Sequence, residues 1–264
     1  MPAEKSPEPE MTYLRMQAEM GITKHIGGLG ATKLLISWCG IKEGMHVLDA
    51  GCGIGTTSCR LAEKYCCKVT GIDVSPKMVE WANKKAKEKK LEGKVSFRVA
   101  DAQDLPFKDS TFDAVISESV TVFIKDKKKA LREYFRVVKK GGYVGINEST
   151  WIKKPLPKEI LDYTHEAFDD VEFSSPSEWE KMLKDSGLKE TKCKAFTIGY
   201  FQEIKDRFEL IGIKGLALGG LRMIWSLITK PYFRKYFIKL SKSAAKVPRN
   251  IFDYMGYGIY AGKK

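Results

Sequence analysis

The sequence offers little from which to build a metal centre or an export signal. Its 264 residues include three histidines and six cysteines, and the cysteines form no Cys-x-x-Cys pair. A structural zinc site needs such clusters, so we expect no metal and reduced thiols. Residues 1–10 are rich in proline and glutamate and lack the apolar stretch of a signal peptide. We therefore expect a disordered tail and a cytoplasmic protein.

Two phosphate-binding patterns are also missing. Residues 46–55 read HVLDAGCGIG, a predicted strand followed by three alternating glycines. No Lys-Ser/Thr pair follows Gly55, which excludes a P-loop. Thr56 stands where a dinucleotide-binding G-x-G-x-x-G motif needs its third glycine, which excludes that motif as well.

Nucleic acid is not the expected partner. Residues 117–120 read SESV, not the N/D-P-P-Y/F loop typical of enzymes that methylate the amino groups of DNA or RNA bases, and no Pro-Cys occurs. The net charge is +13, but residues 201–249 alone hold eleven Lys/Arg against three acidic residues. Basicity confined to one segment is weak support for nucleic-acid binding, so it needs a local explanation.

Strands alternate with helices along most of the chain. The predicted strands are 45–50, 67–73, 95–101, 112–118 and 141–148, and the predicted helices between them are 56–65, 77–90 and 126–140, the last ending on Gly141. This alternation predicts a Rossmann-like α/β fold with a mostly parallel sheet. Segments 190–201 and 254–262 are expected to complete seven strands, with antiparallel pairing as one option.

The predicted organisation has five parts. They are a disordered tail (1–10), N-terminal cap helices interrupted by GGLG at 27–30 (11–44), a cofactor-binding core (45–200), a basic helical insertion (201–249) and a final core strand (250–264). An insertion of this length is too long for a plain connection within a compact domain.

Three neighbouring strands are predicted to end in Asp49, Asp73 and Asp101. Ligands bind at the carboxyl ends of strands in open α/β sheets. Asp73 could accept both hydroxyls of a ribose, and Asp101 with Ala102 could contact an adenine amino group. Carboxylates repel a pyrophosphate but suit S-adenosylmethionine, which carries an ammonium, a sulfonium and no phosphate. The electrostatics therefore favour S-adenosylmethionine as the cofactor.

The segments VLDAGCGIG, VTGIDVSPKMVEWA, VADAQDLPF and FDAVISE resemble, in order and spacing, the successive motifs of class I S-adenosylmethionine-dependent methyltransferases. The resemblance covers about residues 10–200 and the last strand. QDLPFKDSTFDAV and VVKKGGY are most similar to the ubiquinone/menaquinone-biosynthesis type, which methylates small molecules. The resemblance implies cofactor contacts at Asp49, Gly51, Cys52, Gly53, Asp73, Val74, Met78, Asp101, Ala102, Ser117 and Glu118.

A second resemblance precedes the first strand. IGGLGATKLL (26–35) is similar to the S-G-G-x-x-A-T-K segment of phosphoethanolamine methyltransferases, which folds over the cofactor. It implies that Gly27 and Gly28 lie against the methionine moiety and that Tyr13 contacts the cofactor and assists catalysis. Ile26 replaces the serine of that segment, and Phe123 stands where a histidine is expected.

Methyl transfer from a sulfonium is an in-line displacement, so catalysis depends mainly on positioning. A general base is needed only when the acceptor is a neutral hydroxyl or an acidic carbon. The candidates at the predicted cavity are Tyr13, His25, Glu118 and Glu148, with Trp151 as a further acceptor contact. The alternatives are structural: a helix-end hydrogen bond for His25, a solvated loop carboxylate for Glu118 and loop support for Glu148.

The insertion begins with an apolar run at 208–228. Glu209, Lys214, Arg222 and four glycines interrupt it, so we expect no membrane span. Residues 230–246 mix aromatics with lysines, as interfacial segments do. One hypothesis is a substrate lid whose basic outer face contacts an anionic membrane; the alternative is a packed lid with its lysines in water.

The predicted function is a cytoplasmic, S-adenosylmethionine-dependent methyltransferase that acts on a small or lipid-like acceptor of the quinone or prenyl-lipid type. Two alternatives stay open. One is a phosphobase or small-amine N-methyltransferase, and the other is a non-catalytic regulator that binds S-adenosylmethionine.

Overall fold

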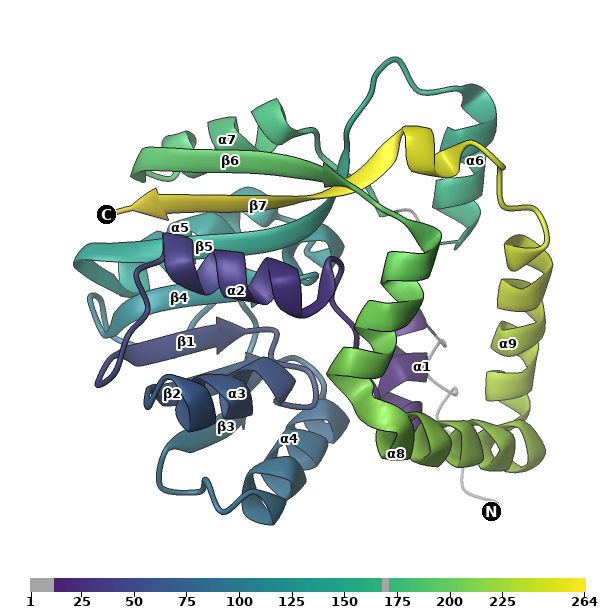
Figure 1. Cartoon of the computed structure of the whole chain (residues 1–264), viewed down its shortest axis with the longest axis horizontal. Coiled ribbons are helices and arrows are strands. Elements are labelled where there is room, and N and C mark those ends of the chain that lie inside the picture. Colours follow the sequence, from purple (N-terminus) through teal and green to yellow (C-terminus); the bar gives the residue numbers. More distant parts are fainter. Residues whose placement is uncertain (1–11, 168–170) are drawn as a thin grey trace, which may run out of the picture.

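The computed structural model describes residues 12–167 and 171–264. Seven strands form one sheet in the order β3-β2-β1-β4-β5-β7-β6 (Figure 1). The strands are β1 (His46–Ala50), β2 (Lys68–Asp73), β3 (Val95–Val99), β4 (Phe112–Glu118), β5 (Val138–Trp151), β6 (Lys189–Thr197) and β7 (Met255–Lys263). The first five are parallel, and β7 is antiparallel to both neighbours. This confirms the predicted Rossmann-like fold.

Helices cover both faces of the sheet. On one face the core contains residues of α2 (Gly28–Trp38), α3 (Thr56–Lys64) and α4 (Pro76–Glu88). On the other it contains residues of α5 (Lys127–Val137) and α7 (Pro176–Asp185), as Figure 1 shows. Two fully buried apolar layers thus hold the parallel strands rigidly and fix where their carboxyl ends lie.

Local capping explains where the helices beside these carboxyl ends begin. Ser75 is the N-cap of α4, where its hydroxyl accepts a hydrogen bond from the Met78 amide, and Pro76 occupies the first turn. Both residue types favour a helix start, because the hydroxyl satisfies a free amide and proline has none to satisfy. The connection from β2 to α4 is therefore short and well defined.

The strand predicted at 190–201 ends at Thr197, and a helix begins at Tyr200. The boundary between the last predicted helix of the core and the strand after it is also wrong. The helix predicted at 126–140 ends at Val137, and Val138 already pairs with Phe112 in the sheet. Gly141 has a φ of 79°, but it lies within β5 and donates its amide to the Lys264 carbonyl. A glycine after a run of helix-forming residues predicts a helix end from local sequence alone. Pairing with distant segments overrides this preference and makes the segment a strand.

The GGLG segment does not interrupt a helix but begins one. α1 (Tyr13–Met20) ends at Gly21, whose left-handed conformation closes the helix, and Gly27 is the N-cap of α2. The break between the two helices therefore precedes the glycines that were expected to form it. The predicted tail, residues 1–10, lies outside the described residues.

The segment between β6 and β7 forms α8 (Tyr200–Thr229) and α9 (Pro231–Ala244). These helices stand beyond the carboxyl ends of the parallel strands, with α1 between them and the sheet and α6 (Lys158–Ala167) against α9 (Figure 1). Two short 3-10 turns, η1 (Thr121–Phe123) and η2 (Ile251–Asp253), complete the fold. By length and composition, Phe208–Thr229, with a mean hydropathy of 1.4, could cross a membrane.

Gly212 divides α8. Its φ of 72° and ψ of 159° are non-helical and kink the helix between an inner half and an outer half. The outer half is held by Arg222, whose guanidinium lies 4.2 Å from the Trp81 ring centroid and donates to the Met20 carbonyl at 3.1 Å. At its end, Lys230 pairs with Glu19.

Candidate active site

A cavity of about 540 Å³ opens at the carboxyl ends of the parallel strands, a volume typical of sites for small molecules. It is lined by the loops after β1, β2, β3 and β4, by α1 and the segment between α1 and α2, and by Leu210 of α8. Eleven predicted site residues line it: His25, Asp49, Gly51, Cys52, Gly53, Asp73, Val74, Met78, Asp101, Ala102 and Glu118.

The glycine loop after β1 is tightly enclosed by the protein itself. Gly51 and Gly53 have φ values of 80° and 51°, which side-chain-bearing residues rarely adopt. A Cβ at Gly51 would lie 2.3 Å from Val120, and one at Gly53 would lie 2.7 Å from Thr23. The loop needs glycines because two neighbouring segments of the protein approach its backbone, a reason that motif matching does not reveal.

Asp49 and Asp73 are held in place before any ligand arrives. Asp49 accepts a hydrogen bond from the Ser58 hydroxyl at 2.5 Å, and Asp73 accepts from the amides of Gly53 (3.0 Å) and Ser75 (2.9 Å). Burial raises the pKa of Asp49 to about 7, helped by the nearby carboxylate of Glu118. Burial also raises the pKa of Asp73. Both carboxyl groups are therefore positioned before a ligand binds.

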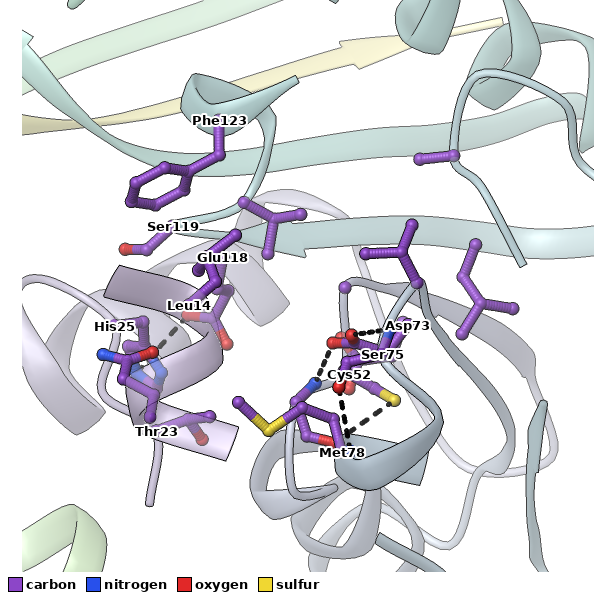
Figure 2. Close-up of a pocket in the computed structure, with 18 of the residues that line it drawn as sticks. Leu14, Thr23, His25, Cys52, Asp73, Ser75, Met78, Glu118, Ser119 and Phe123 are labelled. Carbon is purple, nitrogen blue, oxygen red and sulfur yellow. Dashed lines mark hydrogen bonds and ion pairs between the residues drawn. The ribbon is translucent and has the colours of Figure 1, made fainter. Parts of the chain in front are cut away.

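This half of the cavity fits the nucleoside predicted from the sequence. Asp101 contributes a third carboxylate, which accepts from the backbone amide and side-chain amide of Gln103. Figure 2 shows Asp73 grouped with Cys52, Ser75 and Met78 on one side of the cavity. A phosphate would face three carboxylates here, whereas the ribose hydroxyls and positive charges of S-adenosylmethionine would meet acceptors.

The opposite side holds a buried polar network centred on Glu118. The two carboxylate oxygens accept from the hydroxyls of Thr32 and Thr57, each at 2.9 Å. His25 is buried beside it, with Nε2 3.6 Å from Glu118 Oε2 and 2.8 Å from the Thr32 hydroxyl. Figure 2 shows His25 and Glu118 on the same side of the cavity as Phe123.

The surroundings of His25 indicate which ring nitrogen carries the proton in the neutral ring. Nε2 lies 3.1 Å from the Gly28 carbonyl oxygen, which can only accept a hydrogen bond. Nε2 therefore carries the proton, and Nδ1 is the basic nitrogen of the neutral ring. Glu118 would stabilise the ring once it gained a second proton. The pair thus has the composition of a general base with a supporting carboxylate.

Glu148 lies behind the cavity. It is fully buried, and its Oε1 accepts from the amides of Val120 (2.8 Å) and Thr121 (2.6 Å). Burial raises its pKa to about 8. Ser117 is also fully buried, 3.0 Å from the Thr121 hydroxyl. Neither residue is among those that line the cavity; both support the turn after β4.

Tyr13 and Trp151 also lie outside the lining residues. Tyr13 stacks on the lining residue Phe123 with 6.3 Å between ring centroids. Trp151 is buried against Phe173 at 5.3 Å. Tyr13 therefore contacts a lining residue, and Trp151 belongs to the core beneath α6.

Gly27 lines a second cavity of about 330 Å³ rather than the first, and Gly28 lines neither of the two. A Cβ at Gly27 would lie 2.5 Å from the Tyr257 ring, and one at Gly28 would lie 2.4 Å from the Asp206 carboxyl carbon. Side chains of β7 and α8 thus pack closely against these two glycines. Their contact with the cofactor stays a prediction.

Several lining or supporting residues were missed. Thr32 and Thr57 orient Glu118, Ser58 holds Asp49, and Leu210 brings α8 to the cavity. Serine and threonine are too common for a pattern to single them out. Only Thr32 carried a signal, because it lies within the GGLGATK segment.

Similarity to known proteins agrees with this geometry. Residues 48–146 match the family model described as a methyltransferase domain. The chain is 31% identical over 70% of its length to phosphoethanolamine N-methyltransferase 1 and 32% identical over 72% to chloroplastic tocopherol O-methyltransferase, both of Arabidopsis thaliana. It spans 37% and 58% of these relatives. The structure of the cyclase SpnF superposes with a TM-score of 0.77 at 20% identity, covering 97% of this chain and 98% of SpnF.

The fold and the acidic, strand-end cavity define a class of nucleoside-binding α/β proteins. Within that class, the chain contains a class I S-adenosylmethionine-dependent methyltransferase domain. This confirms the family predicted from the sequence. The likeness to SpnF concerns the fold alone.

Proposed function

We propose that the protein transfers a methyl group from S-adenosylmethionine to a small or lipid-like acceptor, with the quinone or prenyl-lipid type favoured. One observation carries the proposal: a single cavity joins a three-carboxylate half to a half containing the His25–Glu118 pair and apolar side chains. The first half suits the cofactor, and the second suits an acceptor with one polar group on an apolar body.

Each half has a distinct task. When bound, the cofactor supplies an activated methyl group. Asp73 and Asp101 would bind the adenosine, and Asp49 would face the positively charged end of the cofactor. Holding the reacting atoms in line can contribute up to ~7–11 kcal/mol, so rigid placement is the main catalytic contribution.

On the acceptor side, Nδ1 of His25 would take the proton of a neutral hydroxyl as the methyl group arrives. Glu118 would stabilise the resulting imidazolium and would itself stay in place through Thr32 and Thr57. Phe123, Leu14 and Leu210 supply apolar contact around the acceptor. The proposed location is the cytoplasm, with peripheral contact to an anionic membrane through residues 201–249, which also act as a lid.

A second candidate is methylation of a phosphobase or small amine. The similarity to phosphoethanolamine N-methyltransferase 1 favours it. Against it, Phe123 places an apolar ring on the cavity where that resemblance expects a histidine, and the ring stacks on Tyr13. A third candidate, a non-catalytic regulator, would use the cofactor half alone.

Two measurements on the full chain separate these candidates. Calorimetry with S-adenosylmethionine and S-adenosylhomocysteine should show binding of both. Transfer of a labelled methyl group into a lipid extract should exceed transfer into a polar extract. Transfer confined to the polar extract would favour the amine candidate, binding without transfer would favour the regulator, and absence of binding would contradict all three.

His25→Ala tests the base directly. For a hydroxyl acceptor, loss of a general base should reduce methyl transfer by about 10²–10⁴-fold while cofactor affinity stays within a few-fold. His165→Ala is the matched control, because His165 is an exposed residue of α6 outside the cavity lining. Equal activity of the two variants would show that His25 has no role as a base.

A further inference from the structure

The outer half of α8 presents apolar side chains to solvent as well as to the protein. Its inward side contains the buried Gly219 and Ser226 and the half-buried Arg222. The exposed fractions of Ile213, Leu221, Trp225 and Ile228 are 79%, 63%, 65% and 66%. Together with Leu218 and Ile224, these residues form what we call the apolar ridge: Ile213, Leu218, Leu221, Ile224, Trp225 and Ile228.

The spacing places the ridge on one helical face. The six ridge positions fall within about 140° at 100° per residue, the width of a face that normally packs against a core. Lys214 is exposed on the same face at its start. A soluble protein rarely leaves an apolar surface of this extent uncovered. The ridge therefore needs an apolar partner outside the described part of the chain.

The neighbouring helix supplies positive charge without any negative charge. The exposed side of α9 carries Arg234, Lys235, Lys239 and Lys242, a set we call the basic face. From Leu210 to Phe252 the sequence contains nine basic residues and no acidic one. α9 and the outer half of α8 lie together at the outer edge of the molecule (Figure 1). An occupant must therefore be apolar and anionic at once.

A bilayer with anionic lipids has this combination, since its acyl region is apolar and its headgroups are negative. We infer that the ridge inserts shallowly into an anionic membrane while the basic face binds the headgroups. The outer half lies on the bilayer and does not span it. Its residues 213–229 reach only about 25 Å, and Arg222 ties its inner side to Trp81 and the Met20 carbonyl.

The helix that carries this surface also reaches the cavity. Gly212 separates the ridge from the inner half of α8, whose Leu210 lines the cavity. The inference therefore deepens the proposed function and rests on it in one respect: a lipid-like acceptor would enter from the membrane along α8. Binding to vesicles itself requires neither cofactor nor acceptor.

The test uses the full chain with vesicles of phosphatidylcholine alone and of phosphatidylcholine with 30% phosphatidylserine. The wild type should co-sediment only with the second kind, and 0.5 M salt should weaken binding. Trp225→Ser/Ile228→Ser should weaken it at least tenfold. Lys235→Gln/Lys242→Gln should weaken it about 25-fold, because each lysine near the surface contributes roughly fivefold.

Matched controls leave the surface intact. Leu161→Ser removes an exposed apolar residue of α6, and Lys87→Gln/Lys128→Gln removes two exposed lysines of α4 and α5. Both should bind vesicles as the wild type does. Brominated lipid should quench wild-type fluorescence more than that of Trp225→Phe, which reports insertion of this side chain.

Three outcomes would overturn the inference. They are no vesicle binding by the wild type, equal binding by the ridge variant, and a dimer in solution that Trp225→Ser/Ile228→Ser dissociates, since the ridge would then belong to a protein interface. Calorimetry with S-adenosylmethionine on the same samples keeps the two proposals apart. Cofactor binding without vesicle binding rejects only the membrane surface, and vesicle binding without cofactor binding rejects only the proposed function.

Discussion

The carboxyl ends of the strands and the α8–α9 insertion are organised differently. At the strand ends, Asp49, Asp73 and Glu118 are each held by hydrogen bonds from neighbouring residues. The insertion packs on α1 through a buried cluster with Phe233 and Tyr236, is also held by Arg222 and Lys230, and turns other apolar side chains outward. Polar groups that are fixed in advance suit a defined ligand, whereas an exposed apolar face suits a surface without defined shape. A substitution at the strand ends should therefore affect cofactor binding alone, and one on the apolar ridge should affect vesicle binding alone.

The largest expected effect comes from Asp73→Ala. It removes the acceptor for the Gly53 and Ser75 amides. It also removes the two charge-assisted hydrogen bonds that we propose from Asp73 to the ribose. Loss of about 4 kcal/mol corresponds to roughly a thousandfold weaker S-adenosylmethionine binding in calorimetry. Vesicle binding should not change. The control is Asp162→Ala, which breaks only an exposed pair with Lys158. Cofactor affinity within threefold of the wild type would contradict the assigned role of Asp73.

The next effect concerns pH and Glu148. Burial raises its folded-state pKa to about 8 from an ordinary value of 4.5. Between these values the folded protein keeps a proton that the unfolded chain has lost, so this contribution to stability is present below pH 4.5 and disappears as the pH rises through 8. Glu148→Gln keeps an acceptor for the Val120 and Thr121 amides and cannot ionise.

Denaturant unfolding at pH 5 and pH 8.5 measures this difference. The free energy of unfolding of the wild type should fall between the two pH values by on the order of 3 kcal/mol more than that of Glu148→Gln. Glu92→Gln changes an exposed glutamate and serves as the control. Parallel pH profiles for wild type and Glu148→Gln would show that Glu148 ionises normally in the folded protein.

The smallest effect tests the kink of the insertion. Gly212→Ala places a side chain at a φ of 72° and a ψ of 159°, a conformation that only glycine adopts readily, in a space with no neighbour within 4 Å. The cost of about 1–2 kcal/mol is therefore purely one of backbone strain. The thermal midpoint should fall, and cofactor affinity should stay the same.

Gly220→Ala should raise the thermal midpoint, whereas Gly212→Ala should lower it, and it serves as the control. Gly220 is helical and also has open space around it, so alanine should stabilise the helix by about 0.5–1 kcal/mol. If both variants shifted the thermal midpoint in the same direction, the kink at Gly212 would not be the feature that separates the two halves of α8.

The sequence predicted the fold well wherever the signal was local. Strand-end aspartates and alternating glycines mark the loops, and Asp49, Asp73 and Asp101 line one cavity. The prediction failed at 138–140, because this segment belongs to β5. Val138 pairs with Phe112, and the Gly141 amide bonds to the Lys264 carbonyl, so the strand depends on residues outside the local pattern. A run of lysines before two glycines looks the same at a helix end and inside a strand.

The two glutamates predicted at strand ends show why the site could be predicted only in part. Glu118 pairs with Asn147, so Glu148 lies one residue further along the neighbouring strand. Glu118 lines the cavity, and Glu148 is buried behind the next turn. Side chains alternate between the faces of a sheet, so one residue of offset decides between the two positions. The position of Gly27 and Gly28 likewise depends on Tyr257 and Asp206, which follow much later in the chain.

The position of β7 has a consequence for how the protein is made. β7 lies between β5 and β6 and is the last of the described strands in the chain. During synthesis β6 leaves the ribosome before the strand that joins it to the sheet, and α8 and α9 emerge in the interval. The parallel part can assemble early, but β6 has unpaired edges until β7 has been synthesised. The apolar ridge therefore leaves the ribosome before β7 joins β6 to the rest of the sheet.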